Sequence, residues 1–506
     1  MLSKVTGYVL DGLSGYPVTV EVDTNSGLPV FDIVGLPDAA VKESKERVRS
    51  AIKNSGKSFP NHRITVNLAP ADMRKEGVGL DLPIAVGIVV ASGQVAVKRG
   101  NDCVLIGELS LDGSVRGISG VLPILISAKE AGFKEAIIPK ANEKEASFIE
   151  GLTVRPVEKL SDAINFLSGT KDLFPVEKQN YFATAKRVVY ENDLKFVKGQ
   201  KLARRALEVA VSGNHNIIMT GPPGAGKTML AKCIPSIMPD MDFEEALETT
   251  KIHSVAGILA DDEGIVYKRP FMTPHHTASR PSLVGGGSSS NPGIISLAHN
   301  GVLFLDEMPE YPRSLLECLR QPLEDRVITV SRVKANVKYP ASFMLVGSMN
   351  PCPCGNYGSK TAQCKCTPAM IQRYRSRISG PLIDRMDIRL TVGSVQYSDL
   401  IEKADGESSE VVRQRVNRTR LIQRERFREE NIKTNAEMSE KHLKKYCSLS
   451  ESCESILRDS FEILNMSARA RSRILKVART IADMEMSRNI CEEHLIEAIS
   501  YRGQDD

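Results

Sequence analysis

The chain has 506 residues, of which 42% are hydrophobic and 25% are charged, a length that exceeds one hydrophobic core and predicts about two to four domains. Its 67 basic and 62 acidic residues leave a net charge of only +5, which excludes a general polyanion-binding coat and requires local basic patches for any nucleic-acid partner. The N-terminus lacks the apolar core of a signal peptide, and the apolar run Leu82–Ala91 is too short to span a membrane. We therefore expect a cytoplasmic protein with reduced cysteines and no membrane partner.

The first part of the chain, residues 1–170, mixes strand and helix signals, as an α+β domain does. Apolar residues alternate within 63–70, which predicts a strand with one buried face. The apolar run after Asp81 has the length and the small residues of a buried helix. A polar segment at 171–192 then separates two halves of different composition, and we expect it to be a linker.

The second half begins as an α/β pattern and ends as a helical one. Within 193–395, short apolar runs of strand type alternate with helical patterns, which is typical of a parallel sheet. The clearest strands are predicted at 216–220, 302–305 and 343–346. Within 396–506 the chain is charged and helical, and apolar residues on a late helix recur at spacings of three and four. We expect an α/β core followed by a helical lid domain.

The sequence GPPGAGKT follows a predicted strand and opens a helix, which is the context of a phosphate-binding P-loop. Its glycines let backbone N–H groups close around phosphate oxygens, and the helix N-terminus adds favourable partial charge. Lys227 is predicted to reach the β- and γ-phosphates of ATP, and the Thr228 hydroxyl to hold Mg²⁺. The predicted phosphate-binding residues are Gly221, Pro222, Pro223, Gly224, Ala225, Gly226, Lys227 and Thr228.

Two further strands end in residues suited to ATP hydrolysis. GVLFLDE ends in two carboxylates, of which Asp306 is predicted to orient Mg²⁺ and Glu307 to polarise the attacking water as general base. Asn350, at the end of VGSMN, either positions that water or forms a turn. Arg385 and Arg469 are candidates for stabilising charge on the transferred phosphoryl group, although arginines without such a role are common on protein surfaces.

Four cysteines follow Asn350 directly. Cys352 and Cys354 form one CxC pair, and Cys364 and Cys366 form another. Four thiolates from one compact loop can hold Zn²⁺ tetrahedrally, and such a site would be structural because the protein supplies every ligand. Two-residue spacers are commoner in zinc sites, so reduced thiols that fill a loop and a redox pair remain alternatives.

Together these motifs resemble the magnesium-chelatase-like AAA+ ATPases of the ComM/YifB competence type. The resemblance covers essentially the whole chain and is carried by VKGQKLARRALEVAVSGNHNIIMTGPPGAGKT, MTPHHTASRPSLVGGG, PGIISLAHNGVLFLDEMPE, NPCPCGNYG and RYRSRISGPLIDRMDI. It implies that Gly199 and Gln200 lie near the adenine, that Asn350 is sensor 1 and that Arg469 is sensor 2. It also implies that Arg385 is an arginine finger, which reaches the nucleotide site of a neighbouring subunit.

The same resemblance implies an activity and partners. The expected protein is a hexameric ring that uses ATP and Mg²⁺ to move single-stranded or branched DNA, as a helicase or branch-migration factor in DNA recombination. The expected setting is the integration of DNA during natural transformation, with recombination proteins as further partners. The rival functions are a chelatase motor subunit that drives Mg²⁺ insertion into a porphyrin, and a protein-remodelling AAA+ ATPase. For a chelatase subunit, the family implies no N-terminal domain of the kind described next.

Residues 1–170 resemble the proteolytic (S5-type) domain of Lon proteases, through GELSLDGSV and AKEAGFKEAIIPKANEKEA. KEGVGLDLPIAV matches the segment of the catalytic serine, but Gly79 stands in the place of the serine and Leu122 in that of the activating lysine. Neither residue can serve in a Ser–Lys dyad. We expect the fold without peptidase activity, with a role in ring assembly or DNA contact.

Basic residues are concentrated at two further places. The runs DRVITV and KANVKYP predict a hairpin with Arg332 and Lys334 at or near its tip, and in a ring such tips would point into the central channel and follow a phosphate backbone. The alternative is a solvated tip. Residues 411–435 hold eight Lys or Arg against three Glu, which predicts either a nucleic-acid surface or a solvated helix face.

Overall fold

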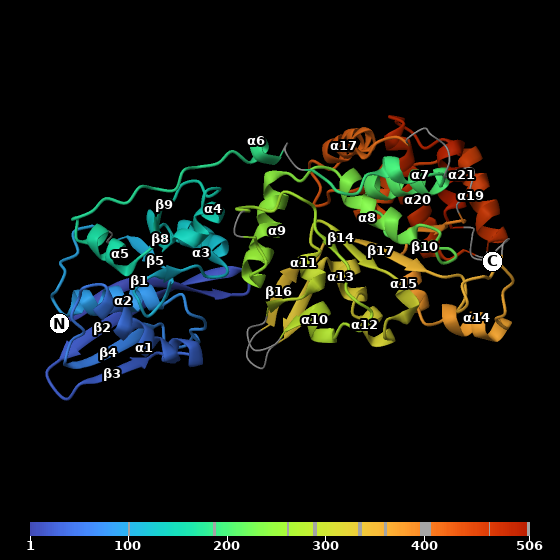
Figure 1. Ribbon diagram of the computed structural model, residues 1–506. Coiled ribbons are helices and arrows are strands. Elements are labelled where there is room, and N and C mark those ends of the chain that lie inside the picture. The colour runs from blue at the N-terminus through green and yellow to red at the C-terminus, as the bar shows by residue number, and fades with distance from the viewer. Residues whose placement is uncertain are drawn as a thin grey trace.

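The structure is a computed structural model that describes residues 1–99, 102–185, 189–260, 263–286, 291–331, 336–358, 362–394, 406–464 and 466–502. The molecule is elongated, with the N-terminal domain at one end and the C-terminal helices at the other (Figure 1). The predicted DNA-contacting residues Arg332 and Lys334 lie outside the described residues. Among the helices of the described chain, none combines the length and the apolar composition needed to cross a membrane.

A seven-stranded sheet organises the N-terminal domain, in the order β3-β4-β2-β1-β5-β8-β9. β2 pairs antiparallel with both β1 and β4, and the other neighbours in the sheet pair in parallel. The strands are β1 (Leu2–Asp11), β2 (Ser14–Asn25), β3 (Val30–Val34), β4 (Arg63–Ala69), β5 (Cys103–Leu105), β8 (Glu135–Pro139) and β9 (Thr153–Val157), and a separate pair is formed by β6 (Glu108–Leu109) and β7 (Val115–Arg116). Strand β4 confirms the predicted alternation, because Ile64, Val66 and Leu68 are all fully buried.

Helices cover both faces of this sheet and bury two separate apolar cores. One face carries α1 (Ala39–Asn54), α2 (Asp81–Ala91) and α5 (Leu160–Leu167), and the other carries α3 (Val121–Glu130) and α4 (Glu143–Ala146), which follows η1 (Lys140–Asn142). All residues of α2 except Val90 are buried, which confirms the predicted buried helix. The buried Asp81 carboxylate is matched by Arg47, whose Nε lies 2.7 Å from it.

The segment 171–192 connects the two halves and, where it is described, packs against both. The backbone N–H of Val176 donates to the carbonyl of Val154 in β9 at 2.8 Å. Tyr181, in α6 (Tyr181–Ala185), is buried, and its hydroxyl donates to the carbonyl of Met241 at 2.9 Å. The buried Val176 and Tyr181 therefore anchor the connection to the first and the second half, respectively.

The core of the second half is a five-stranded sheet with the order β11-β14-β17-β10-β18, in which every neighbouring pair is parallel. Its strands are β11 (Phe271–Met272), β14 (Val302–Leu305), β17 (Met344–Met349), β10 (Ile217–Thr220) and β18 (Ile388–Thr391). The three predicted strands are confirmed. β17 extends beyond the predicted end because residues 347–349 continue to pair with β10.

Helices lie on both faces of this sheet (Figure 1). One face carries α7 (Lys201–Gly213), which follows η2 (Leu194–Phe196), and α8 (Lys227–Ile237). On these helices pack the lid elements α17 (Ser409–Arg426), η4 (Asn435–Glu437), α18 (Glu440–Tyr446), α19 (Glu451–Ile463), α20 (Ala468–Met484) and α21 (Glu492–Ser500). The predicted apolar stripe on α20 is confirmed, because Ile474, Val477, Ala478 and Ile481 are buried.

The other face is covered by shorter elements. They include the hairpin of β15 (Val327–Ser331) and β16 (Asn336–Pro340), which pair antiparallel as predicted. The remaining elements of the second half are α9 (Phe243–Ala256), α10 (Arg280–Val284), β12 (Gly285–Gly286), β13 (Asn291–Pro292), α11 (Ile294–Leu297), η3 (Met308–Glu310), α12 (Arg313–Glu317), α13 (Arg320–Asp325), α14 (Pro368–Arg375) and α15 (Gly380–Ile383).

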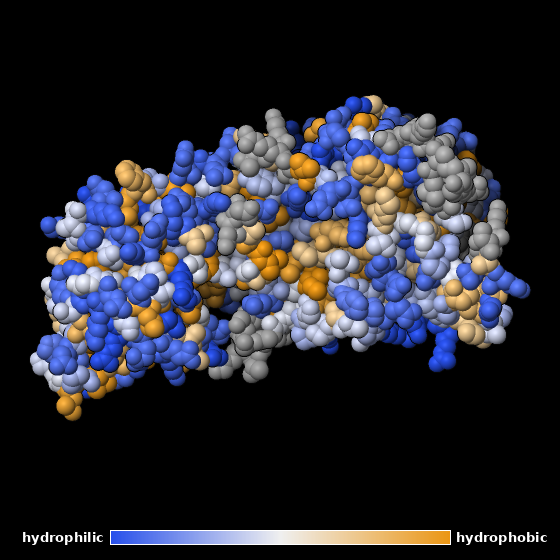
Figure 2. Space-filling view, viewed as in Figure 1, coloured by the Kyte–Doolittle hydropathy of each residue, from blue (hydrophilic) through white to orange (hydrophobic). Residues whose placement is uncertain are grey.

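The two halves meet where α3 packs near α9, and Figure 2 shows apolar side chains gathered in this middle part of the molecule. Ser254 of α9 donates its hydroxyl to the Glu145 carboxylate at 2.8 Å, and its carbonyl accepts from the Gly120 backbone at 3.0 Å. Glu145 also accepts the backbone N–H of Leu122 at 3.3 Å. The position that aligns with the Lon lysine is therefore part of the contact with α9.

Glu145 is the group on which this contact depends. Its carboxylate is buried, and burial raises its pKa, although hydrogen bonds from Ser254 and Asn142 oppose that shift. The Glu145 carboxylate accepts hydrogen bonds from Leu122, Asn142 and Ser254. Removal of the carboxylate therefore leaves these donors without their acceptor.

We predict that Glu145→Ala lowers the free energy of unfolding by about 1–3 kcal/mol, because buried donors lose their partner. Thermal and chemical denaturation measure this change. The matched control is Glu130→Ala, which removes an exposed glutamate from α3 and should change stability little. Equal effects of the two substitutions would contradict the importance of the contact.

Candidate functional site

The P-loop leaves β10 and enters α8, as predicted. Gly224 and Gly226 have φ angles of 76° and 87°, in the left-handed region that glycine adopts readily. Gly221 is required for a different reason, because a Cβ atom there would lie 2.3 Å from the carbonyl oxygen of Val392. The loop is thus tightly packed against the end of β18.

Lys227 connects the P-loop with the tip of β17. Its Nζ donates to the carbonyls of Gly221 at 2.7 Å and Pro222 at 3.0 Å, and to Oδ1 of Asn350 at 3.2 Å. Burial lowers the pKa of Lys227, whereas the nearby Asp306 and Glu307 raise it. Six of the predicted ATP-site residues therefore lie together, although they come from three different strand ends.

A second set of contacts orders the two carboxylates. The Thr228 hydroxyl donates to Oδ2 of Asp306 at 2.9 Å, and the Ser348 hydroxyl donates to Oδ1 at 2.5 Å. Ser348 Oγ in turn accepts the backbone N–H of Glu307 at 3.1 Å. Glu307 has a φ of 50°, a left-handed conformation that is uncommon for a residue with a side chain and is often found at functional sites.

The sequence reasoning missed Ser348. This serine is fully buried and fixes both Asp306 and the backbone of Glu307. A signal for it exists, because residues 348 and 350 are two positions apart at the end of one strand and so point to the same side. The oxygen ligands of Thr228 and Asp306, held together in this way, fit the preference of Mg²⁺ for oxygen.

The residues predicted to lie near adenine reach the same end of the sheet. Gly199 and Gln200 both have left-handed backbones, with φ angles of 62° and 53°. The Gln200 side chain donates to the carbonyl of Gly393, just after β18, at 2.6 Å. Val392 pairs with Thr220 immediately before the P-loop, so Gln200 is placed beside it.

The two arginines lie at the opposite end of the sheet. Arg385 precedes β18, and its carbonyl accepts from the side chain of Asn216, which precedes β10, at 3.1 Å. Arg469 lies near Arg385, since its guanidinium is 3.8 Å from Asp384. Five residues of extended chain from Asn216 to Gly221 span roughly 16 Å. Neither arginine can therefore reach the P-loop of its own chain.

Within one chain, Arg385 is held by its own neighbours. Its side chain is only 9% exposed, forms an ion pair with Glu324 of α13, and donates to the carbonyl of Pro381 at 2.5 Å. Burial lowers the pKa of Arg385, and the nearby arginines Arg320 and Arg469 lower it further. Arg469 differs, because 68% of its side chain is exposed. Ser467 caps its helix.

The four clustered cysteines converge. Cys352 Sγ lies 3.4 Å from Cys354 Sγ and 3.7 Å from Cys364 Sγ, and the ligand atoms of all four cysteines, including Cys366, lie within 4.8 Å of one another. Ligands about 2.3 Å from a tetrahedral Zn²⁺ are separated by about 3.8 Å, so the geometry fits zinc. Backbone N–H groups, first that of Asn356, lower the pKa of Cys354 to about 6.

The cysteine loop also contacts the P-loop. Gly355 has a φ of 80°, and a Cβ atom there would lie 2.6 Å from Cδ of Pro223. The loop begins directly after Asn350, at the tip of β17, and it packs on the P-loop through Gly355. A metal ion held by the loop would stabilise this arrangement.

Some basic residues of the segment 411–435 form ion pairs within the chain, whereas Arg418, Arg428 and Lys433 are exposed. Arg415 pairs with Glu208 at 2.6 Å, Arg424 with Asp242 at 2.9 Å, and Arg413 and Arg426 also form ion pairs. Part of the positive charge therefore binds acidic groups elsewhere in the same chain.

Comparisons with known proteins agree with this architecture. A family model described as magnesium chelatase, subunit ChlI, matches residues 193–400, and models for subunit ChlI of Mg-chelatase and for its C-terminal part match residues 20–142 and 406–502. Competence protein ComM of Haemophilus influenzae is 42% identical over 97% of this chain and 96% of its own length. YifB of Escherichia coli is 42% identical over 98% of this chain and 96% of its own.

The chain belongs to the magnesium-chelatase-like ComM family. This confirms the resemblance found in the sequence. Family membership places the five-stranded sheet and its P-loop within the AAA+ class. A further ComM-family relative, Rv2897c of Mycobacterium tuberculosis, is 40% identical over 99% of this chain and 98% of its own length.

The likeness to Lon proteases is partial. Lon protease 1 of Myxococcus xanthus is 29% identical over 172 residues, which are 32% of this chain and 21% of the protease. At the two positions predicted to align with the dyad, Gly79 has no side chain and lies next to Ile118, and Leu122 is buried.

We predict that the chain, purified without chelator, carries about one Zn²⁺, because the four thiolates converge at tetrahedral spacing. The double variant Cys354→Ser, Cys366→Ser should lose the metal and melt at a lower temperature, and Cys318→Ser, remote from the cluster in sequence, should keep it. Metal analysis by mass spectrometry measures the content. A metal-free wild-type chain would exclude the zinc site.

Proposed function

We propose that this protein is the ATP-hydrolysing subunit of a ring-shaped DNA motor, a helicase or branch-migration factor of DNA recombination. The observation that carries the proposal is the division of the ATP site. One chain holds the P-loop, Asp306, Glu307 and Asn350 at one end of the sheet, and Arg385 and Arg469 at the other. A complete site then requires two adjoining chains.

The residues of one chain have distinct roles in this proposal. ATP with Mg²⁺ supplies the phosphoanhydride bond to be broken, and its phosphates bind the P-loop N–H groups and Lys227. Thr228 and Asp306 hold Mg²⁺, with Asp306 fixed by Ser348. Glu307 takes the proton of the attacking water, and Asn350 orients that water, since its side chain already faces Lys227.

The neighbouring chain contributes the two arginines. A guanidinium beside the γ-phosphate stabilises the charge that spreads over its oxygens during transfer. Arg385 must exchange its ion pair with Glu324 for the phosphate, which makes subunit contact a condition for turnover. Arg469 is already exposed and needs no such exchange. We propose that both act in trans, in a hexameric ring.

DNA as the transported polymer is supported by two observations. The Haemophilus influenzae relative is named a competence protein, which fits the integration of DNA in natural transformation. The β15–β16 hairpin precedes β17, the strand that ends at Asn350, so a movement of the ATP site can be transmitted to it. Arg332 and Lys334 of its connecting segment would bind phosphates of single-stranded or branched DNA. Recombination proteins are further expected partners.

The first test addresses the division of the site. Lys227→Ala should abolish ATP binding, and Arg385→Ala should retain binding but lose turnover by about a thousandfold or more. When the two inactive variants are mixed and reassembled at random, about a quarter of the interfaces pair an intact Lys227 with an intact Arg385, so ATPase activity should return. Steady-state phosphate release measures it.

The control for that test is Glu307→Gln mixed with Lys227→Ala. Both residues serve the same half of the site, so this mixture contains no composite site with both groups intact and should stay inactive. Equal recovery in the two mixtures, or recovery in neither, would contradict the trans assignment of Arg385.

The second test addresses the substrate. Forked and single-stranded DNA should raise ATP turnover, and Arg332→Ala with Lys334→Ala should lower the slope of log affinity against log salt by about two per bound subunit. Lys338→Ala, which removes an exposed cation from β16, is the matched control and should change the slope less. Turnover that no form of DNA stimulates would favour a chelatase motor or a protein-remodelling ATPase.

A further inference from the structure

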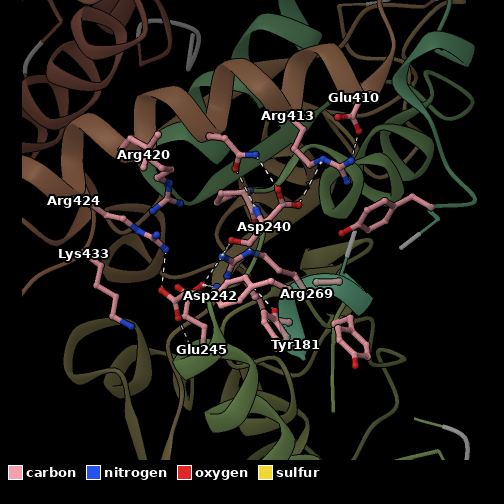
Figure 3. Close-up of a pocket in the computed structure, with 18 residues that line it drawn as sticks. Tyr181, Asp240, Asp242, Glu245, Arg269, Glu410, Arg413, Arg420, Arg424 and Lys433 are labelled. Atoms are coloured by element: carbon pink, nitrogen blue, oxygen red, sulfur yellow. Dashed lines mark hydrogen bonds and ion pairs between the residues drawn. The ribbon is translucent and has the colours of Figure 1, made fainter. Parts of the chain in front are cut away.

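A cavity of about 720 Å³ lies apart from the ATP site (Figure 3). Its walls are the lid helix α17, α6 of the connecting segment, and the stretch Pro239–Glu245 that follows α8. Its described lining includes none of the residues predicted to bind ATP. The volume falls within the range of about 300–1,000 Å³ that is typical of small-molecule pockets.

One face of α17 forms the upper wall in Figure 3. Arg413, Asn417, Arg420 and Arg424 line the cavity, and their spacing of four, three and four residues places them on a single helix face. Long cationic side chains thus project from the lid towards the core. In a cavity of this size they concentrate positive charge.

Most of the charges in the cavity are matched. Arg424 pairs with Asp242 at 2.9 Å, and Arg269 donates to Glu245 at 2.7 Å. Arg413 pairs with Asp240 at 3.8 Å and also with Glu410. All four carboxylates of the lining therefore have an arginine partner.

Two cations lack such a partner among the described residues. Arg420 donates only to the carbonyl of Val211, at 3.0 Å, and its buried Nε has no hydrogen-bond partner. Lys433, which is exposed, forms no ion pair within the described part of the chain. Both lie near Glu245: burial alone would raise the pKa of that carboxyl, but Arg269, Lys433 and Arg420 lower it to about 2.

These cations face a space that an anion can fill. Arg420 lines the cavity without a carboxylate partner among the described residues, and an anionic oxygen in the cavity would form a charge-assisted contact with its guanidinium. With five basic and four acidic side chains in the lining, the cavity carries one surplus positive charge (5 − 4 = +1). A ligand with one compact anionic group satisfies both observations.

The other side of the cavity is aromatic. Tyr181, Phe182, Tyr190 and Tyr267 all contribute to the lining. The rings of Tyr181 and Tyr267 are nearly parallel, at 14° with centroids 5.5 Å apart, and Arg413 lies 5.3 Å above the ring of Tyr190. Such a wall offers flat apolar surface on which a planar ring can pack.

We propose that this cavity is a second ligand site that takes a free nucleoside monophosphate, with its phosphate at Arg420 and Lys433 and its base against the aromatic wall. The ligand connects the lid helix α17 to the segment that directly follows the P-loop helix α8, so it would stabilise the docking of the lid. This inference goes beyond the proposed motor function and requires neither ATP hydrolysis nor DNA.

A free ligand fits the location better than a DNA strand does. The cavity lies against α17, which packs on the same face of the core sheet as α7 and α8. The hairpin strands β15 and β16 pack in the core on the other face. A strand guided by the hairpin would therefore pass on the side of the sheet away from this cavity.

The test measures binding of adenosine 5′-monophosphate to the full-length chain by titration calorimetry. The Lys227→Ala variant, in which the ATP site is disabled, should still bind one AMP per chain. In that background, Lys433→Ala and Arg420→Gln should each weaken binding about tenfold or more, because a charge-assisted contact to phosphate is lost. Arg418→Ala, an exposed arginine on the same helix, should leave the affinity unchanged.

Because the Nε of Arg420 is buried, its variant can fail to fold, and melting curves identify that case. The exposed Lys433 keeps the proposal testable. Three results would overturn the proposal. The first is that the Lys227→Ala substitution by itself abolishes AMP binding. The second is that inorganic phosphate binds as tightly as AMP, and the third is that a short single-stranded oligonucleotide binds more tightly than AMP and displaces it. Each is independent of whether DNA stimulates ATP turnover, so failure of this proposal and failure of the motor function are distinguishable.

Discussion

The parallel pairing of β10 with β18 is the constraint from which the rest of the ATP site follows. In this register Ile217 faces Ile388 and Thr220 faces Thr391, so the P-loop leaves one end of the pair while Arg385 enters at the other. A strand cannot shorten or bend enough to bring the two ends together. The separation of Glu307 from Arg385 is therefore built into the sheet.

At the carboxyl end of the sheet, hydrogen bonds fix the positions of the predicted ATP-site residues relative to one another. Ser348 is bound to both Asp306 and the backbone of Glu307, and Lys227 is bound to Asn350. Charged groups held in this way need little rearrangement when phosphate charge develops. The cysteine loop adds to the same unit, because Gly355 packs directly on the P-loop. A structural metal there would act on nucleotide binding without touching the nucleotide.

Local signals in the sequence predicted the elements well, and partners distant in the chain could not be predicted. The alternation in β4, the apolar length of α2 and the P-loop context are local patterns, and each is found as expected. By contrast, Ser254 and Glu145 are 109 residues apart, and no pattern within either segment names its partner. The ion pairs of the basic lid segment could not be predicted for the same reason, since its acidic partners lie in the core.

The N-terminal domain contacts the hairpin of the second half. Its turn between β1 and β2 contains Gly12, with a φ of 62°, where a Cβ atom would lie 2.5 Å from the Val337 side chain in β16. Its α3 packs near α9, and Leu122 shares the Glu145 carboxylate with Ser254. Leu122, the position predicted to align with the lysine of a Lon dyad, therefore lies in the contact with α9. Through Gly12, the N-terminal domain packs directly on a strand of the hairpin.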